Sequence, residues 1–425
     1  MNDYNAEFDV QAYQSRQRER SKMVRERRRI ARRKRQIRRL IIAGIIMLAV
    51  LGLLICLLVA GIKAIIKSVN RDKNKAEVQV VEEIIEPNII EEREEEKIDI
   101  PSYLGYNASA SEGNTCINGM QVFNGYEIKN SEKAYYINSP NVQSLYGILI
   151  DGRNGEVVCQ KEGFVRINPA SMTKILTILV AAENLSEEDL QKTVTITAED
   201  TYYAYKNDLS AAGFANDETV TVEDLFYGTI LPSGADAAMA LAKFVAGDVD
   251  SFIELMNGKI SELGLKNTHF TNCVGSYDAD HYSTCADMAM ILKATIENDY
   301  CYKVMNAHRY TTSKTEAHPD GIDISNWFLR RIEDKDTGGE VLCAKTGFVS
   351  EAGSCAASFS KQNDGHPFFC VTAWAHSAWR CIYDQVDIYA NCTSGGENPY
   401  KDVPMDATPE EIIEEDETTE NAPLE

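Results

Sequence analysis

The chain has 425 residues, of which 65 are acidic and 43 basic, and its formal net charge at pH 7 is −22. This length would hold two or three domains. Eleven cysteines occur without any C-x-x-C pair, which excludes a zinc ribbon or a thioredoxin-type site. The charge is unevenly distributed, because 14 basic residues lie between Arg16 and Arg39 and the rest of the chain is acidic.

An uncharged, apolar stretch follows this basic run at residues 40–62. A helix of that length spans about 34 Å, which is sufficient for the hydrocarbon core of a membrane. A cleaved signal peptide would have a shorter apolar core and a small-residue cleavage site. Nucleic-acid binding is disfavoured, because arginines beside an apolar span are typical of its cytoplasmic end. We therefore predict a single-pass protein of the cell membrane, with a cytoplasmic N-terminus, an extracellular domain and no nucleic-acid partner.

The charge pattern divides the chain into five predicted parts. Runs of glutamate after the apolar span suit a spacer that holds a domain off the membrane. The parts are a basic cytoplasmic tail (1–39), a transmembrane anchor (40–66), an acidic linker with an irregular entry segment (67–125), a folded domain (126–393) and an acidic disordered tail (394–425).

Regular structure in the folded domain begins with a hairpin. Two strand-like segments at residues 145–150 and 156–160 flank a turn. Apolar residues at helical spacing then predict a series of helices, one of which begins at a capping box from Thr221 to Asp224. The predicted helices cover residues 171–182, 222–231, 235–245, 252–263 and 285–297, with a short strand at 194–196.

The last third of the domain is rich in strand-like segments, at residues 341–347, 353–359 and 367–375, and a helix follows at 379–389. We expect the first hairpin and these last strands to share one antiparallel sheet flanked by helices, with an all-helical lobe inserted between them. The predicted fold class is mixed α/β (α+β).

The stretch Asn168-Pro-Ala-Ser-Met-Thr-Lys174 carries the first candidate for catalysis. Ser171 and Lys174 are three residues apart, so in a helix they lie on one face about one turn from each other. A lysine whose pKa is lowered by burial can take the proton of a serine hydroxyl, and a helix N-terminus favours an oxyanion. Alone, a Ser-x-x-Lys pair is weak evidence, because it is also typical of a solvated helix start.

Two later stretches would complete such a site. Ser233 lies in a Pro-Ser-Gly link between two predicted helices, where its hydroxyl either faces a cleft or caps the next helix. Lys345-Thr-Gly347 ends a predicted strand. The glycine lets a ligand approach the backbone closely, while Lys345 and Thr346 supply a charge and a hydroxyl.

In this order and these settings, the three stretches resemble the penicillin-binding D-alanyl-D-alanine carboxypeptidases, low-molecular-weight serine peptidases of the bacterial cell wall. The resemblance implies the fold shared by β-lactamases and DD-peptidases. It also implies that the partners are peptidoglycan stem peptides ending in D-Ala-D-Ala, with β-lactams as inhibitors. The resemblance extends over residues 144–389 and includes residues 148–151, 263–270, 281–284 and 352–355.

The resemblance implies a role for each residue that matches the family's motifs. Ser171 would be acylated by the penultimate D-Ala carbonyl, with release of the terminal D-Ala. Lys174 would be the general base, and Ser233 would relay the proton toward the leaving amine. Water would then hydrolyse the acyl-enzyme.

The remaining implied roles concern substrate binding. Lys345 would set the electrostatics of the cleft, and Thr346, beside Gly347, would bind the terminal carboxylate. The backbone N–H groups of Ser171 and Phe348 would form the oxyanion hole. Some relatives bind the carboxylate with an arginine near the position of Arg380, although a surface arginine without a role is an equal alternative.

Ala235 departs from the family, whose middle motif usually reads Ser-x-Asn. The side-chain amide that would bond the substrate backbone and the surroundings of the lysine is therefore absent. Asp236 cannot replace it, because the next residue of a helix is rotated by about 100° around the helix axis. The alternatives are therefore a β-lactamase, a transpeptidase or a catalytically weakened cell-wall binding protein. No metal-ligand spacing of histidines and no G-x-S-x-G elbow occurs, so we assign neither a metal nor a cofactor.

Cys343, Cys355 and Cys370 fall on the three strands predicted in the last third. Hairpin pairing about turns near 349 and 362 would set them side by side. We expect them to be buried thiols, with no disulfide among the three.

Overall fold

The computed structural model describes residues 115–130, 133–394 and 398–403. The predicted cytoplasmic tail and transmembrane anchor lie outside these residues, as do most of the linker and of the C-terminal tail. Within the described ranges, no helix is long and apolar enough to cross a membrane.

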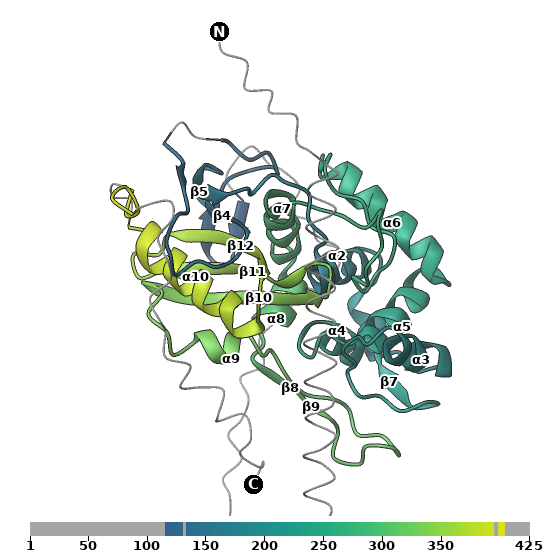
Figure 1. Ribbon diagram of the computed structural model, residues 1–425. Helices are drawn as coiled ribbons and strands as arrows, with labels where there is room; N and C mark the ends of the chain where they lie inside the picture. The colour runs from purple at the N-terminus through teal and green to yellow at the C-terminus, as the bar shows by residue number, and fades with distance from the viewer. Residues whose placement is uncertain (1–114, 131–132, 395–397, 404–425) are drawn as a thin grey trace, which may run out of the picture. The chain divides into compact units, whose positions relative to one another are not determined.

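A six-stranded sheet in the order β10-β11-β12-β4-β5-β3 forms the centre of the domain (Figure 1). The first hairpin and the last three strands share this sheet as predicted, because β12 pairs with β4. Neighbouring strands are antiparallel except that β3 runs parallel to β5, so the sheet is mixed and the expectation of a purely antiparallel sheet is wrong. The strands are β3 (Tyr135–Tyr136), β4 (Tyr146–Asp151), β5 (Val157–Lys161), β10 (Gly339–Val349), β11 (Gly353–Gln362) and β12 (Pro367–Ala375).

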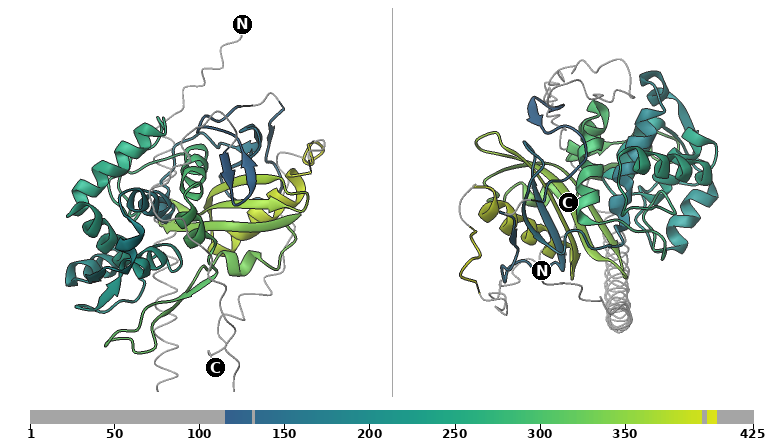
Figure 2. Two further views of the ribbon diagram at one scale, coloured as in Figure 1. Left: turned by 180° about the vertical axis from the view of Figure 1, so that it is seen from behind. Right: turned by 90° about the horizontal axis from the view of Figure 1, so that it is seen from above.

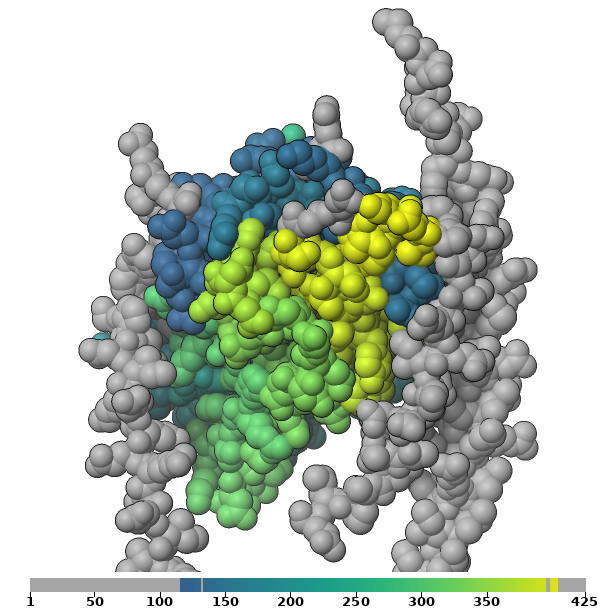
Figure 3. All heavy atoms as spheres, turned by 90° about the vertical axis from the view of Figure 1, so that its left-hand side faces the viewer, coloured from purple at the N-terminus to yellow at the C-terminus, as the bar shows by residue number. Residues whose placement is uncertain are grey.

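Helices cover both faces of this sheet (Figures 1 and 2). One face carries α10, which packs on β11 and β12 and forms part of the molecular surface, together with the short α9 (Figure 3). The other face carries α7, which packs on β4, β11 and β12, and α8, which packs on β10. These helices are α7 (Cys285–Ile296), α8 (Asp299–Asn306), α9 (Leu329–Ile332) and α10 (Ala378–Cys392).

A helical lobe packs on the α7 side of the sheet through α2, which contacts α7. Thr221 caps α4 as predicted, with a capping box to Asp224. The lobe also contains a two-stranded sheet of β6 (Thr193–Thr195) and β7 (Thr219–Thr221), so it is not all-helical. Its helices are α2 (Lys174–Glu183), α3 (Ala198–Lys206), α4 (Val222–Ile230), α5 (Ala235–Ala246) and α6 (Val249–Glu262), and a separate hairpin of β8 (Arg309–Thr311) and β9 (Asp323–Ser325) follows α8.

The two faces of the sheet bury separate apolar clusters, because side chains alternate along a strand. On β11, Ala357 and Phe359 join the larger cluster, which extends into the helical lobe. Ala356, the residue before Ala357, points the other way and joins the cluster beneath α10. The sheet thus joins two cores, and the lobe shares only one of them.

The strand register separates the three cysteines that the sequence analysis placed side by side. Cys343 pairs with Phe359, and Cys355 pairs with Gly347. The reason is that the turn between β10 and β11 occupies residues 350–352 and is therefore centred later than position 349. Cys370 lies opposite Ser358 on the next strand. The predicted row is wrong, although all three cysteines are buried thiols.

The folded part extends beyond both predicted boundaries of the domain. The hairpin of β1 (Thr115–Ile117) and β2 (Met120–Val122) precedes residue 126, and its apolar side chains join the larger core. At the other end Tyr400 is buried, and the Asn138 amide donates to the Val403 carbonyl at 2.7 Å. These short segments lack the apolar periodicity on which the predicted boundaries depended.

Asp384 on α10 ties that helix to the segment that precedes β4. One carboxylate oxygen accepts from the backbone N–H and the hydroxyl of Ser144, at 2.7 and 2.6 Å. The other accepts from the Gln143 N–H at 3.0 Å and from Nε of Arg380 at 3.1 Å. The carboxylate is fully buried and both of its oxygens are occupied, so it joins α10 to residues 143–144.

We expect Asp384→Ala to lower the free energy of unfolding by about 3 kcal/mol, because it removes the counter-charge of the buried Arg380 guanidinium and the acceptor of the buried Ser144 N–H and hydroxyl. Urea unfolding of the folded domain measures the change. Glu254→Ala, on the exposed side of α6, is the control and should leave the midpoint unchanged. Equal midpoints for the two variants would contradict this account of α10.

Candidate active site

Ser171 lies at the junction between two helical segments. Residues Ala170–Thr173 form a 3₁₀ turn, and α2 begins at Lys174. The sequence analysis expected one α-helix here, but three-residue spacing aligns side chains in a 3₁₀ turn as well. Ala170 has a φ of 50°, in the left-handed region that is unfavourable for alanine. The residue before Ser171 is therefore held in a strained conformation by its surroundings.

His281 contributes to this restraint through Thr173. Its Nδ1 accepts from the Thr271 N–H at 3.0 Å, so the proton of the neutral ring lies on Nε2, which is 2.8 Å from the Thr173 hydroxyl. That hydroxyl donates to the Ala170 carbonyl at 2.8 Å. Burial lowers the pKa of His281 to about 3, which keeps the ring neutral. The chain of bonds ends on the residue before Ser171.

Lys174 and Ser171 are in hydrogen-bond contact, with Nζ 3.0 Å from Oγ. The lysine side chain is fully buried. Removal from water lowers the pKa of Lys174 to about 7, against smaller opposing effects of Cys273 and Asp236. Close to neutral pH, a substantial fraction of this lysine is therefore a free amine beside a serine hydroxyl.

Lys345 and Ser233 form a second pair. Lys345 Nζ donates to Ser233 Oγ at 2.8 Å and to the Thr346 carbonyl at 2.7 Å. Burial, and then the charge of Lys174, lower the pKa of Lys345 well below its usual value. Ser233 has a φ of 64° in the link before α5, a second strained non-glycine residue.

A cleft with a cavity volume of about 310 Å³ opens in front of these pairs. The structure brings Ser171, Ser233, Thr346, Gly347 and Phe348 to its walls, and the two lysines lie buried behind their serines. The sequence analysis did not identify the other lining residues, which are Asp208, Leu209, Ser210, Ser354, Cys355, His376, Ser377, Ala378 and Cys381.

Gly347 allows β10 to pass directly beside the 3₁₀ turn. A Cβ atom at this position would lie 2.8 Å from the Pro169 carbonyl oxygen and 2.9 Å from the Ser171 nitrogen. Backbone atoms at these distances leave no room for a side chain. This approach brings the end of β10, with Thr346 and Phe348, to the serine.

Arg380 does not join the cleft, which corrects the predicted substrate contact. Its guanidinium donates to Asp384 and to the Asn141 carbonyl, and its side chain is 8% exposed. Spacing along α10 places it toward the segment before β4, whereas Ala378 and Cys381 of the same helix line the cleft. A fixed ion pair is the role that its geometry supports.

Asp236 also turns away from the cleft, in agreement with the expectation that it cannot replace the missing amide beside it. Its carboxylate accepts from the N–H groups of Ala212 at 2.7 Å, Gly213 at 3.2 Å and Ala237 at 2.9 Å. The acid therefore ties α5 to the loop that follows the cleft-lining residues 208–210. A sequence pattern could not identify this role, because all three partners are backbone groups.

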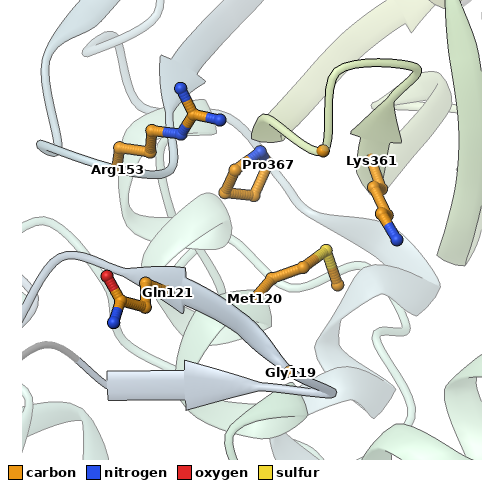
Figure 4. A pocket seen from close by; sticks show the side chains of 7 residues that line it. Gly119, Met120, Gln121, Arg153, Lys361 and Pro367 are labelled. Atoms are coloured by element: carbon orange, nitrogen blue, oxygen red, sulfur yellow. The ribbon is translucent and has the colours of Figure 1, made fainter.

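The structure has a second cavity, of about 440 Å³ (Figure 4). Its lining includes Arg153 and Lys361 but no serine–lysine pair. Lys361 pairs with Glu340 at the start of β10, whereas the cleft lies where β10 ends. Within the described ranges, no group of three or more histidine, cysteine or acidic side chains could hold a metal.

Comparisons with known proteins agree with the site geometry. The peptidase S11 family, described as D-alanyl-D-alanine carboxypeptidase, matches residues 133–373. The chain is 33% identical over 227 residues to the D-alanyl-D-alanine carboxypeptidase of Streptomyces sp. strain K15, an alignment that covers 52% of this chain and 77% of that relative. It is 30% identical over 217 residues to DacF of Bacillus subtilis strain 168, with 51% and 54% covered.

The chain spans about half the length of most of the curated relatives it matches. A crystal structure of the Streptomyces K15 DD-transpeptidase has a TM-score of 0.53 and 28% identity, and the match covers 59% of this chain and 97% of that one. This similarity supports the mixed α/β fold of the DD-peptidases. Because the family match extends over more than half of its residues, the chain belongs to the peptidase S11 family of D-alanyl-D-alanine carboxypeptidases.

Proposed function

We propose that this protein is a serine-type D-alanyl-D-alanine carboxypeptidase that removes the terminal D-Ala from peptidoglycan stem peptides. The observation that carries the proposal is the 3.0 Å contact between the Ser171 hydroxyl and the amine of the fully buried Lys174. The family match and the names of the relatives support the same activity.

Acylation begins when the Ser171 proton passes to the free amine of Lys174 and Oγ attacks the carbonyl carbon of the penultimate D-Ala. The backbone N–H groups of Ser171 and Phe348 are the proposed donors to the resulting oxyanion. The amide bond then breaks, the acyl group stays on Ser171, and the terminal D-Ala leaves as an amine. Hydrolysis by water restores the serine.

Ser233 is the proposed relay, which gives its hydroxyl proton to the leaving nitrogen and receives in its place the proton that Lys174 took from Ser171. Because Lys345 Nζ donates to Ser233 Oγ, the hydroxyl proton of Ser233 remains available to another acceptor in the cleft. Thr346, at the end of β10, is the proposed hydrogen-bond donor to the terminal carboxylate of the substrate.

Transpeptidation is a second candidate function, in which an amine instead of water accepts the acyl group. The observation that favours it is the fold similarity to a Streptomyces K15 protein whose crystal structure is described as that of a DD-transpeptidase. Both reactions share the acyl-enzyme on Ser171 and differ only in the second step.

We infer a location at the outer side of the cell membrane from the apolar span 40–62 and the basic run before it. Peptidoglycan lies on that side. The location inferred from the apolar span therefore agrees with the proposed stem-peptide substrate.

Release of D-Ala tests the activity. With a pentapeptide ending in D-Ala-D-Ala, the extracellular domain should release D-Ala, and Ser171→Ala should lower the rate at least about 1,000-fold because the nucleophile is lost. Ser261→Ala, on the exposed side of α6, is the control and should retain the wild-type rate. Absence of release by the wild-type domain, with or without an added amine acceptor, would contradict the proposal.

The pH dependence of acylation tests the role of Lys174. The reactive form is the neutral amine, whose fraction rises with pH through the pKa of about 7. The rate of labelling by a fluorescent penicillin should therefore rise about tenfold per pH unit below pH 7 and level off above it. Lys174→Ala should lower the plateau at least about 100-fold and abolish the rise. The same profile in both proteins would reject this assignment.

Protease treatment of intact cells tests the topology. The domain beyond the span should be removed while a cytoplasmic marker protein survives, because the basic run is retained inside. Protection of the domain together with the marker would reverse the proposed orientation.

A further inference from the structure

The loop 272–276 places a carbonyl oxygen against both members of the proposed catalytic pair. The Val274 oxygen accepts from Lys174 Nζ at 2.7 Å, and Ser171 Oγ lies 3.4 Å from the same oxygen. Ala235, where relatives usually carry an amide, is fully buried and has no polar side-chain atom. This carbonyl therefore provides the lysine with an acceptor that the middle motif lacks here.

The side chain of Asn272 fixes the orientation of this loop. Its Oδ1 accepts from three consecutive N–H groups, those of Val274 at 3.2 Å, Gly275 at 2.7 Å and Ser276 at 3.0 Å. Its Nδ2 donates to the Ser276 carbonyl at 3.1 Å. With these N–H groups turned toward Asn272, the Val274 carbonyl points to the other side of the loop, where Lys174 lies.

Two further contacts hold the loop against the catalytic helix. The Thr177 hydroxyl, one turn after Lys174 on α2, donates to the Cys273 carbonyl at 2.7 Å. Gly275 has a φ of +75°, and a Cβ there would lie 1.9 Å from the Ala170 carbonyl oxygen. The loop and the turn that carries Ser171 therefore meet backbone to backbone.

We propose that Asn272 is a positioning residue for catalysis, which aims the lone pair of the Lys174 amine at the Ser171 hydroxyl by holding the Val274 carbonyl in place. A neutral amine has two N–H donors and one lone pair. A carbonyl fixed at 2.7 Å takes one N–H and restricts rotation of the amine. The lone pair is then directed at the Ser171 proton that it removes. This inference rests on the proposed function, because it assigns the same base and nucleophile.

The proposal explains how the site is complete without an amide at position 235. A side-chain amide and a peptide carbonyl offer the same acceptor oxygen. The acceptor here is the backbone carbonyl of Val274, and Asn272, two positions earlier in the chain, determines its direction. No hydrogen bond joins Asn272 to Ser171 or Lys174, so it acts on the lysine through the loop that carries the Val274 carbonyl.

The test compares Asn272→Ala with Asn257→Ala, a matched control. Asn257 also bonds the backbone just before this loop, with the Phe270 N–H and C=O at 3.0 and 2.8 Å, but it makes no hydrogen bond to residues 272–276. Both variants remove one half-buried amide. Only Asn272→Ala should release the Val274 carbonyl.

We expect Asn272→Ala to lower the plateau rate of penicillin acylation at least about tenfold. Its acid inflection should move to higher pH, because burial is the main cause of the low Lys174 pKa and a loosened loop admits water. Asn272→Asp keeps the acceptor oxygen and should recover part of the plateau rate. Asn257→Ala should keep the wild-type plateau and inflection, even if its melting temperature falls.

A wild-type plateau and inflection in Asn272→Ala, or the same loss in Asn257→Ala, would overturn the proposal. A lysine-selective NMR titration measures the Lys174 pKa in the same proteins without any acylation step. The signal that disappears in Lys174→Arg is assigned to Lys174. An unchanged Lys174 titration in Asn272→Ala would also overturn it. Failure of the proposed function would instead appear as a wild-type domain that titrates as expected but is not acylated.

Discussion

Removal of two lysine side chains from water is the physical constraint on which this site depends. Lys174 and Lys345 are both buried, and burial is the main reason that the pKa of each is lowered. Neither lysine could be desolvated by the sheet or by the helical lobe alone. Lys345 comes from β10, whereas Lys174 begins α2, and the two elements meet at the 3₁₀ turn. The fold thus provides the proposed base by closing two substructures around it.

Close backbone approach maintains this closure. Gly347 and Gly275 both lie against the turn that carries Ser171, at distances that a side chain would prevent. Ala170 and Ser233 adopt left-handed conformations that cost of order 1 kcal/mol or more each. Strain of this kind persists only where surrounding contacts determine the geometry. One of the strained residues here precedes Ser171 and the other is Ser233, which agrees with a preorganised site.

Much of this arrangement could be predicted from residue types, and the remainder depends on backbone atoms. Strand-like segments separated by turns predicted the three last strands, and the motifs of Ser171, Ser233 and Lys345 indicated side chains that the fold brings together. The contact of Val274 was not predictable, because a carbonyl is common to every residue and only the loop conformation directs it. The substrate contact predicted for Arg380 was wrong because the side chain bonds a backbone carbonyl distant in the chain, that of Asn141, and Asp384 one turn later on the same helix.

The most direct test of the central claim is peptide mapping by mass spectrometry after the folded domain has reacted with benzylpenicillin. The account predicts one covalent adduct, on the hydroxyl of Ser171, because only this serine contacts the Lys174 amine among the described residues. An adduct on Ser233 or on any other residue, or an unmodified protein after prolonged reaction above pH 7, would contradict it.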